Sequence, residues 1–425
     1  MTVHLLYKAL WMAVIRIVFL LFIVSGYLRA QDTLKITLPQ ADSLLVIRNL
    51  SLIAFHYEVD KAEAAKTQAK LFNNPELSTE WSLYNPETTR WFDAGKQGQK
   101  IVALQQVFRI AGQRNASINL AQEEKRMTQS QYSELVRTLK YELHVSFYRY
   151  HFLNSAIVNI RSQLGLLKNL INVYGDQYKK GNISLQELTR LNTAYFTINN
   201  QVRETQQELV TLQQNLQILL AEDRFILPQD SEVVSFSFTN TSLQDLFDKA
   251  LENRPEIKTI QSMEAQQQFK YKLARKEAVP DVVAGVLYDQ AGNYVSNYTA
   301  FTIGLKIPIF NRNQGQIQSA RIGMQQAKIM LQLKQQQVIS EVKTAWNVFL
   351  LLQQQYNSTG VNYESELDLL SEGLVNNYSK NNISLLEFTD LFESYNSNII
   401  QYNQLKADLN KSYEELTYAV GEDLQ

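Results

Sequence analysis

The feature that most limits the fold of this chain is an internal repeat with an offset of two hundred residues. Residues 178–191 read YKKGNISLQELTRL, residues 378–391 read YSKNNISLLEFTDL, and nine of the fourteen aligned positions are identical. The similarity continues downstream, where NLQILLAED ends at Asp223 and ELTYAVGED ends at Asp423. This unit is far longer than the roughly 20–50 residues of a solenoid repeat, so it predicts a duplicated domain. We expect a first copy over residues 31–230 and a second over residues 231–425.

The prolines show where each copy can form long helices. All seven lie outside residues 87–227 and 309–425. Because proline breaks helix interiors, long helices fit these two stretches. The expected helices cover 114–180 and 184–220 in the first copy, and 315–378 and 384–420 in the second. The first of them would extend on the order of 90–100 Å at 1.5 Å per residue.

The repeated motif lies between the two helices of each copy. Gly181 and Asn381 tolerate the left-handed backbone that ends a helix. Ser184 and Ser384 are expected to be N-caps, and the glutamate three residues after each completes a capping box. The motif is therefore predicted to be the tip of a long helical hairpin, present twice.

Strand signals precede the first long helix of each copy. Apolar side chains alternate with polar ones over residues 77–83 and 301–309, and residues 100–108 and 281–289 complete two hairpins. This alternation fits a membrane strand between lipid and a wet lumen, and it equally fits an ordinary half-buried antiparallel sheet. Four strands cannot close a barrel, and lipid does not tolerate open edges. Membrane strands would therefore have to be shared among several subunits.

Composition and motifs exclude several classes of function. The net charge is −1 with no long block of one sign, so no nucleic-acid partner is expected. The absence of cysteine excludes disulfides, thiolate nucleophiles and cysteine-bound metal. His144 and His151 are seven residues apart, beyond the one-turn spacing of a helical zinc pair, and are interpreted as ordinary helix histidines. No nucleophile elbow, phosphate loop or dinucleotide fingerprint is present, so no enzyme activity, metal site or cofactor is expected.

Residues 1–30 have the layout of a secretory signal peptide. Lys8 and Arg16 precede the apolar run 17–24, and Ala30 provides a small residue for cleavage. An N-terminal membrane anchor is the alternative interpretation. No other stretch is long and apolar enough for a spanning helix, so any further insertion must use strands.

The chain resembles the TolC-like outer membrane efflux proteins in its signal peptide, in its duplicated unit of two strands and a long helical hairpin, and in its two hairpin tips. QVFRIAGQR at 106–114 and IPIFNRNQGQI at 307–317 resemble the segments where a strand of that family passes into the helical barrel. The second segment is most like the heavy-metal branch, the CzcC- and CusC-like proteins. The resemblance implies a mainly α fold with a membrane β-barrel portion, in which a homotrimer forms a twelve-stranded barrel continued by a periplasmic α-helical barrel.

The resemblance also implies a function. The protein would be the passive exit duct of a tripartite efflux system in a Gram-negative outer membrane. It would conduct metal ions or small toxic compounds received from an inner-membrane pump of the RND type and a periplasmic adaptor. A coiled-coil structural protein of the cell envelope, without transport activity, remains the alternative.

Candidate site residues follow from the tips and strands. Arg190 in the first copy of the motif and Asp390 in the second occupy the same position but carry opposite charges. Each lies three residues after a glutamate, Glu187 or Glu387, and so shares a helix face with it. By resemblance, Glu387 and Asp390 would line the pore gate, and Arg190, beside Glu187, would be a lock partner for Asp390. A solvated helix face is the alternative. The resemblance places adaptor docking and lipid contact at these residues: Gly181, Asn182, Ile183, Asn381, Asn382 and Ile383 for docking, and Phe301, Ile303 and Leu305 for lipid.

Overall fold

A computed structural model describes residues 33–93, 95–96, 98–229, 233, 242–292, 295–359, 363–380 and 382–424. The predicted signal peptide and Asn381 lie outside these residues. The elements are β1 (Thr33–Ile36), α2 (Leu38–Arg48), α3 (Leu50–Ala69), β2 (Glu76–Trp81), β3 (Tyr84–Asn85), β4 (Arg90–Trp91), β5 (Lys100–Phe108), α4 (Gln113–Lys179), α5 (Leu185–Leu220), β6 (Phe225–Pro228), α6 (Leu243–Asn253), α7 (Pro255–Lys276), β7 (Val282–Asp289), β8 (Tyr298–Leu305), α8 (Gln314–Thr359), α9 (Tyr363–Ser379) and α10 (Leu385–Val420).

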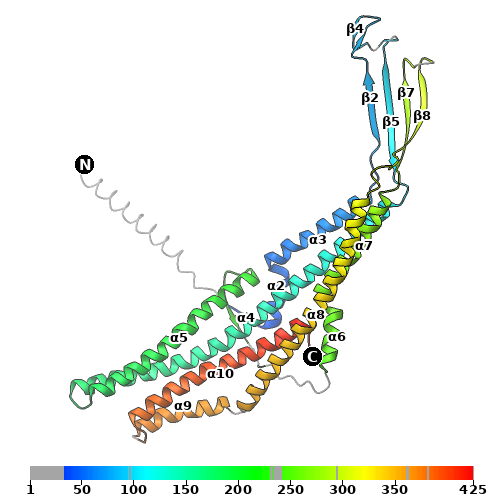
Figure 1. Ribbon diagram of the computed structural model, residues 1–425. Coiled ribbons are helices and arrows are strands. Elements are labelled where there is room, and N and C mark those ends of the chain that lie inside the picture. Colours follow the sequence, from blue (N-terminus) through cyan, green and yellow to red (C-terminus); the bar gives the residue numbers. More distant parts are fainter. Residues whose placement is uncertain are drawn as a thin grey trace, which may run out of the picture. The chain divides into compact units, whose positions relative to one another are not determined.

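The chain divides into two compact units, and each draws segments from both halves of the sequence. The first, which we call the hairpin unit, comprises residues up to Asn49, Leu139–Ser237 and Asn347–Glu415. The second, the sheet unit, comprises Leu50–Thr138, Phe238–Trp346 and the residues from Leu416 onward. Figure 1 shows the elements of both units. Among the described residues, no helix is both long and apolar enough to cross a membrane.

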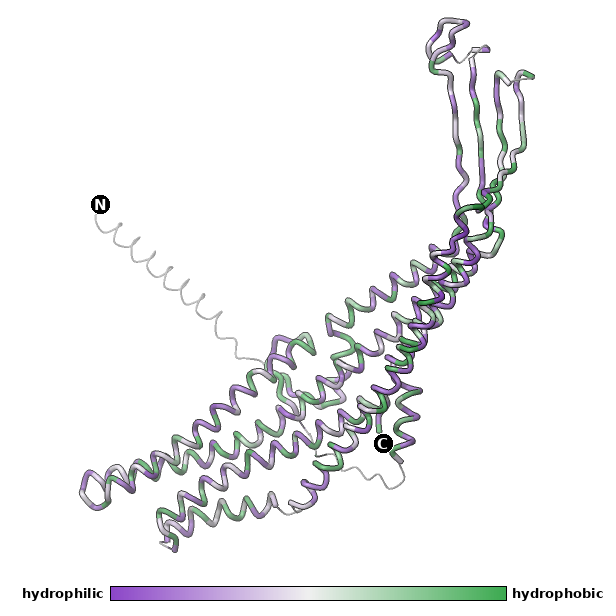
Figure 2. The backbone as a smooth tube through the Cα atoms, in the orientation of Figure 1, coloured by the Kyte–Doolittle hydropathy of each residue, from purple (hydrophilic) through white to green (hydrophobic). Residues whose placement is uncertain are grey.

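The long helices of the hairpin unit bury narrow apolar stripes. Hydrophobic and hydrophilic residues alternate along these helices in Figure 2. One core cluster contains Ile157, Leu191, Ile198 and Phe392, from α4, α5 and α10. A second cluster joins α2, α4 and α5 to the parallel strands β1 and β6. These stripes bury enough surface to hold the helices together while their flanks stay polar.

The predicted long helices agree with the structure over the described residues. α4, α5 and α10 begin and end within one residue of the expected limits. The helix expected over 315–378 is described as α8, up to Thr359, and α9, from Tyr363, and residues 360–362 between them lie outside the described residues. At the end of α8, the hydroxyls of Ser358 and Thr359 donate to the carbonyl of Gln355 at 2.8 and 3.0 Å. Ser117 and Thr128 make similar bonds inside α4, so bonds of this kind are compatible with a continuing helix.

The sheet unit contains an antiparallel sheet with strand order β2-β5-β7-β8. Its strands carry the two hairpins that the sequence predicts, and β2 and β8 are the edges. β8 ends at Leu305, so the predicted alternation up to residue 309 continues beyond the strand. Pro308 lacks an N–H for a ladder bond, which limits strand pairing in that segment.

Candidate functional site: the hairpin tips and the exposed sheet face

The first tip is a left-handed turn followed by a fully capped helix. Gly181 has a φ of +76°, and Asn182 N–H donates to the Gln177 carbonyl at 3.0 Å. The Glu187 carboxylate accepts from Ser184 N–H at 2.8 Å, and Glu187 N–H donates to Ser184 Oγ at 3.3 Å. The hydrogen bonds from Ser184 lower the pKa of Glu187. The turn and capping box predicted from the sequence are confirmed here.

The second tip repeats the same cap. The Glu387 carboxylate accepts from Ser384 N–H at 2.8 Å, and Glu387 N–H donates to Ser384 Oγ at 3.2 Å. The pKa of Glu387 is lowered by the backbone and hydroxyl bonds from Ser384. Asn382 N–H donates to the Asn377 carbonyl at 2.9 Å, as Asn182 does at the first tip. Both glutamates therefore serve as helix caps, and both carboxylates remain charged at neutral pH.

The two tips meet through a charge pair. Arg190 Nη1 lies 3.7 Å from Asp390 Oδ1, and both side chains are exposed. The structure thus pairs Arg190 with Asp390 while Glu187 occupies the cap. A groove of about 750 Å³ surrounds this pair. Its other lining residues come from the first turns of α5 and α10: Leu185, Gln186, Thr189, Thr193, Thr389 and Glu393.

Of the predicted docking residues, the asparagines and isoleucines differ in exposure. Asn182 and Asn382 are exposed, while Ile183 and Ile383 are half-buried. Ile383 packs against the core cluster of the hairpin unit. The asparagines therefore offer hydrogen-bonding groups to solvent, and Ile383 anchors the second turn to the helices beneath it.

An aromatic cluster joins the two hairpins just behind the tips. The hydroxyls of Tyr174 and Tyr378 contact each other. Tyr378 stacks on Phe388 with ring centroids 4.6 Å apart, and Phe388 stacks on Phe392 at 5.5 Å. Burial raises the pKa of the Tyr378 phenol, so it stays neutral. Sequence reasoning missed this cluster, although Tyr378 opens the second copy of the repeated motif.

His144 occupies a buried polar site in the hairpin unit. Its Nε2 lies 2.8 Å from Asp42 Oδ1 and its Nδ1 lies 2.9 Å from Glu414 Oε2. Burial opposes the charged ring, but the bonds to Asp42 and Glu414 outweigh it and raise the pKa of His144 to about 9. Because the two carboxylates contact opposite sides of the ring, they do not form a ligand set for one ion. Within the described ranges, no group of three or more His, Asp or Glu is arranged to hold a metal.

The register of the sheet places the predicted lipid-facing residues on one broad apolar face. Leu77, Leu104, Val286 and Phe301 are consecutive cross-strand partners and form one row. Phe301, Ile303 and Leu305 are 69%, 66% and 57% exposed. The opposite face carries polar residues, among them the row Glu76, Gln105, Gly285 and Thr302. The sheet therefore exposes its hydrophobic face and is not an ordinary half-buried sheet within this chain.

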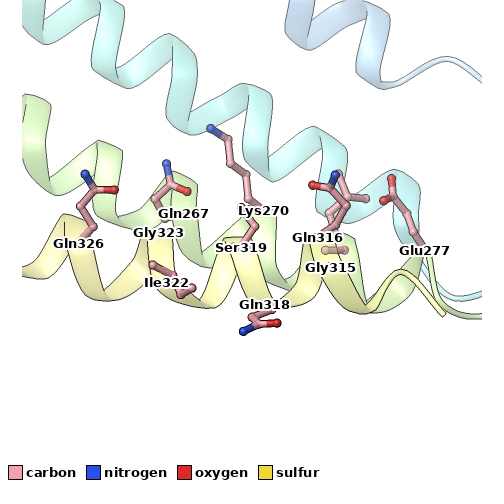
Figure 3. Close-up of a pocket in the computed structure, with 13 residues that line it drawn as sticks. Gln267, Lys270, Glu277, Gly315, Gln316, Gln318, Ser319, Ile322, Gly323 and Gln326 are labelled. Atoms are coloured by element: carbon pink, nitrogen blue, oxygen red, sulfur yellow. The ribbon is translucent and has the colours of Figure 1, made fainter. Parts of the chain in front are cut away.

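A second groove, of about 790 Å³, runs between α7 and α8 in the sheet unit. Figure 3 shows Gln267, Lys270 and Gln316 among the side chains that line it. A Cβ on Gly323 would lie 2.8 Å from Gln267 Oε1, so the glycine allows this close approach. The lining mixes polar side chains with Leu273 and Ile322, and no hydrogen bond described there pairs the Ser319 hydroxyl with a base, as a catalytic nucleophile would need.

The chain has the fold of solved outer membrane efflux channels. Residues 246–422 match the family model described as outer membrane efflux protein, which confirms the resemblance seen in the sequence. The cobalt-zinc-cadmium resistance protein CzcC of Cupriavidus metallidurans CH34 is 24% identical over 291 residues. That alignment spans 67% of this chain and 66% of the relative.

Solved structures agree with this assignment of the fold. The structure of CusC, from work on transmembrane channel formation, has a TM-score of 0.74 at 18% identity and covers 91% of this chain and 92% of its own. The CmeC outer membrane channel of Campylobacter jejuni has a TM-score of 0.74 at 14% identity, with coverage of 90% and 85%. The predicted likeness to the CzcC- and CusC-like branch is thus confirmed.

Proposed function

We propose that this protein is the outer membrane exit duct of a tripartite efflux system. It passively conducts metal ions or small toxic compounds from an inner-membrane pump of the RND type and a periplasmic adaptor to the outside. The observation that carries the proposal is the exposed apolar face of the four-stranded sheet in a chain with the fold of efflux channels. The name of CzcC supports cobalt, zinc and cadmium as the first cargoes to test.

The proposed duct is a homotrimer. β2 and β8 are edge strands, and their outer backbone groups need partners if the apolar face lies in lipid. Pairing β8 of one copy with β2 of the next satisfies both edges, and three copies give a twelve-stranded β-barrel. In this arrangement Phe301, Ile303 and Leu305 face lipid, and the long hairpins continue as an α-helical barrel in the periplasm. The duplicated copies, residues 31–230 and 231–425, then supply equivalent staves.

The tips are proposed to serve two roles. Gly181, Asn182, Ile183, Asn381, Asn382 and Ile383 form the docking surface for the adaptor. Glu387 and Asp390 line the gate, with Arg190 as the lock partner of Asp390 and Glu187 as the cap of the neighbouring helix. The support is the exposure of Asn182 and Asn382 and the 3.7 Å separation between Arg190 and Asp390.

The test is the conductance of the purified protein in a planar bilayer, with heat-modifiable trimers as the assembly readout. We expect stable trimers and discrete conductance steps. A monodisperse monomer that needs no detergent and gives no conductance would contradict the proposal. That result would favour a coiled-coil structural protein of the envelope.

A further inference from the structure

The loop between β2 and β5 exposes a group of large apolar side chains. Leu83, Tyr84, Trp91 and Phe92 are 59%, 44%, 68% and 66% exposed. Tyr84 and Trp91 are cross-strand partners in the short β3–β4 ribbon, with ring centroids 5.2 Å apart. We call these four residues the aromatic patch. Large apolar side chains grouped in this way on a surface indicate that another phase or molecule covers them.

The patch is held on a rigid support. Asp93 is buried, and its Oδ2 accepts from Thr88 Oγ1 at 2.7 Å and from Asn85 Nδ2 at 3.1 Å. Its Oδ1 accepts from Gly95 N–H at 3.0 Å. The bonds from Thr88 and Gly95 lower the pKa of Asp93, which stays charged at neutral pH. A Cβ on Gly98 would lie 1.7 Å from the Asp93 carbonyl oxygen, so only glycine fits there.

The backbone beneath the patch is strained. Thr89 and Phe92 have φ values of 54° and 51°. Residues other than glycine, asparagine and aspartate rarely adopt this left-handed backbone region. Strain of this kind persists where the surrounding structure fixes it, often at binding surfaces. The Asp93 network ties together the described backbone around Trp91 and Phe92, which reduces the backbone entropy that binding would cost.

The patch is next to the apolar face of the sheet. Trp81, the last residue of β2, lies on that face, and the Nζ of its cross-strand partner Lys100 is 5.6 Å from its ring. The loop is also tied to the second hairpin, since Gln290 Nε2 donates to the Gly95 carbonyl at 2.6 Å. Figure 1 places β4 at the end of the sheet remote from the helices of this unit.

These observations point to a lipid surface as the occupant. Trp and Tyr favour the boundary between acyl chains and headgroups, because an apolar ring and a polar atom are both satisfied there. Arg90 and Lys96 are exposed in the same loop and can reach headgroup phosphates, while Glu87 and Asp93 keep the loop close to neutral. We propose that the aromatic patch inserts into the headgroup layer of the bilayer and fixes the depth of the sheet in the membrane.

The inference rests on the proposed function, and four tryptophans allow both to be tested separately. Tryptophan occurs at positions 11, 81, 91 and 346. Three variants, each with the other tryptophans changed to phenylalanine, retain only Trp81, only Trp91 or only Trp346. Each is reconstituted in phosphatidylcholine vesicles whose acyl chains are brominated either near the headgroup or near the chain end. Circular dichroism and heat-modifiable assembly confirm that every variant folds.

With the lipid brominated near the headgroup, Trp91 fluorescence should be quenched about threefold more strongly than Trp346 fluorescence. The lipid brominated near the chain end should quench Trp91 less than the lipid brominated near the headgroup does. Trp81 on the sheet face should be quenched by lipid as well. If Trp81 is quenched while Trp91 responds only to aqueous iodide, the inference is wrong and the proposed function stands; the patch would then face a protein or a carbohydrate. If lipid quenches neither Trp81 nor Trp91, the membrane location itself is wrong, and the proposed function fails with it.

Discussion

The hairpin unit and the sheet unit place their apolar side chains in opposite ways. Phe392 of α10 is 1% exposed and stacks on Phe388 in a closed core, whereas Phe301 of β8 is 69% exposed on an open face. The hairpin unit therefore derives its stability from contacts within the chain. The apolar face of the sheet has no such contacts within the described chain and is suited to an external cover. One chain thus combines a region suited to water with a region suited to a nonaqueous neighbour.

The sharpest test of this comparison removes one aromatic ring from each region. Phe392→Ala should destabilise the hairpin unit by about 3–5 kcal/mol, because it leaves a cavity in a packed core. Phe301→Ala should change the stability of the detergent-solubilised protein by less than about 1 kcal/mol, because the ring is exposed. Thermal and denaturant unfolding, followed by circular dichroism, would measure both. Equal losses would mean that the face at Phe301 is covered by protein.

A charge on the sheet face sharpens the comparison further. Ile303→Lys should cost about 2–4 kcal/mol in bilayer-inserted protein if the side chain lies near the midplane. Thr302→Lys is the matched control, because Thr302 lies next along β8 on the opposite face. Folding of both variants into lipid vesicles at increasing urea concentrations would give the difference in their folding free energies. A cost for Thr302→Lys as large as for Ile303→Lys would argue against lipid at this face.

The hairpin unit should lose stability at alkaline pH. The pKa of His144 rises from its ordinary value of 6.5 to about 9 because Asp42 and Glu414 hold the charged ring. A pKa that is higher in the folded state gives stability that is complete below pH 6.5 and is lost as pH rises through about 9. Lys140, 3.5 Å from Asp42, and the neutral phenol of Tyr148 complete the surroundings.

We expect the loss between pH 6.5 and 9 to be on the order of 1–3 kcal/mol, measured as a fall in the unfolding free energy. His144→Gln should be less stable at pH 6 and should show a flatter profile over the same interval. An unchanged slope in that variant would show that another group titrates.

The smallest effect on stability is expected at the tips. Arg190→Ala should change the unfolding free energy by less than about 1 kcal/mol, since the pair with Asp390 is exposed. Under the proposed gate, the same substitution should raise the resting conductance, and Asp390→Ala should reduce cation selectivity. Lys179→Ala, which removes an exposed pair with Asp176 on α4, is the control. Wild-type conductance and selectivity in both tip variants would place the gate elsewhere.

The elements themselves could be predicted because their determinants are local. The limits of α4 and α5 follow from the absence of proline and from the turn at Gly181, and the Ser184 cap needs only a glutamate three residues later. The alternation along β8 likewise reveals which residues share a face. The helix expected over 315–378 is described as α8 and α9, and residues 360–362 between them lie outside the described residues.

The sequence alone determines the duplicated helices, their caps and the two-faced strands, since these depend on hydrogen bonds and periodicities spanning a few residues. Only the tertiary structure brings Arg190 to Asp390, places His144 between Asp42 and Glu414, and aligns Leu77, Leu104, Val286 and Phe301 in one row. These residues lie far apart along the chain. Their meeting depends on the strand register and on the packing of whole helices, which no local pattern encodes.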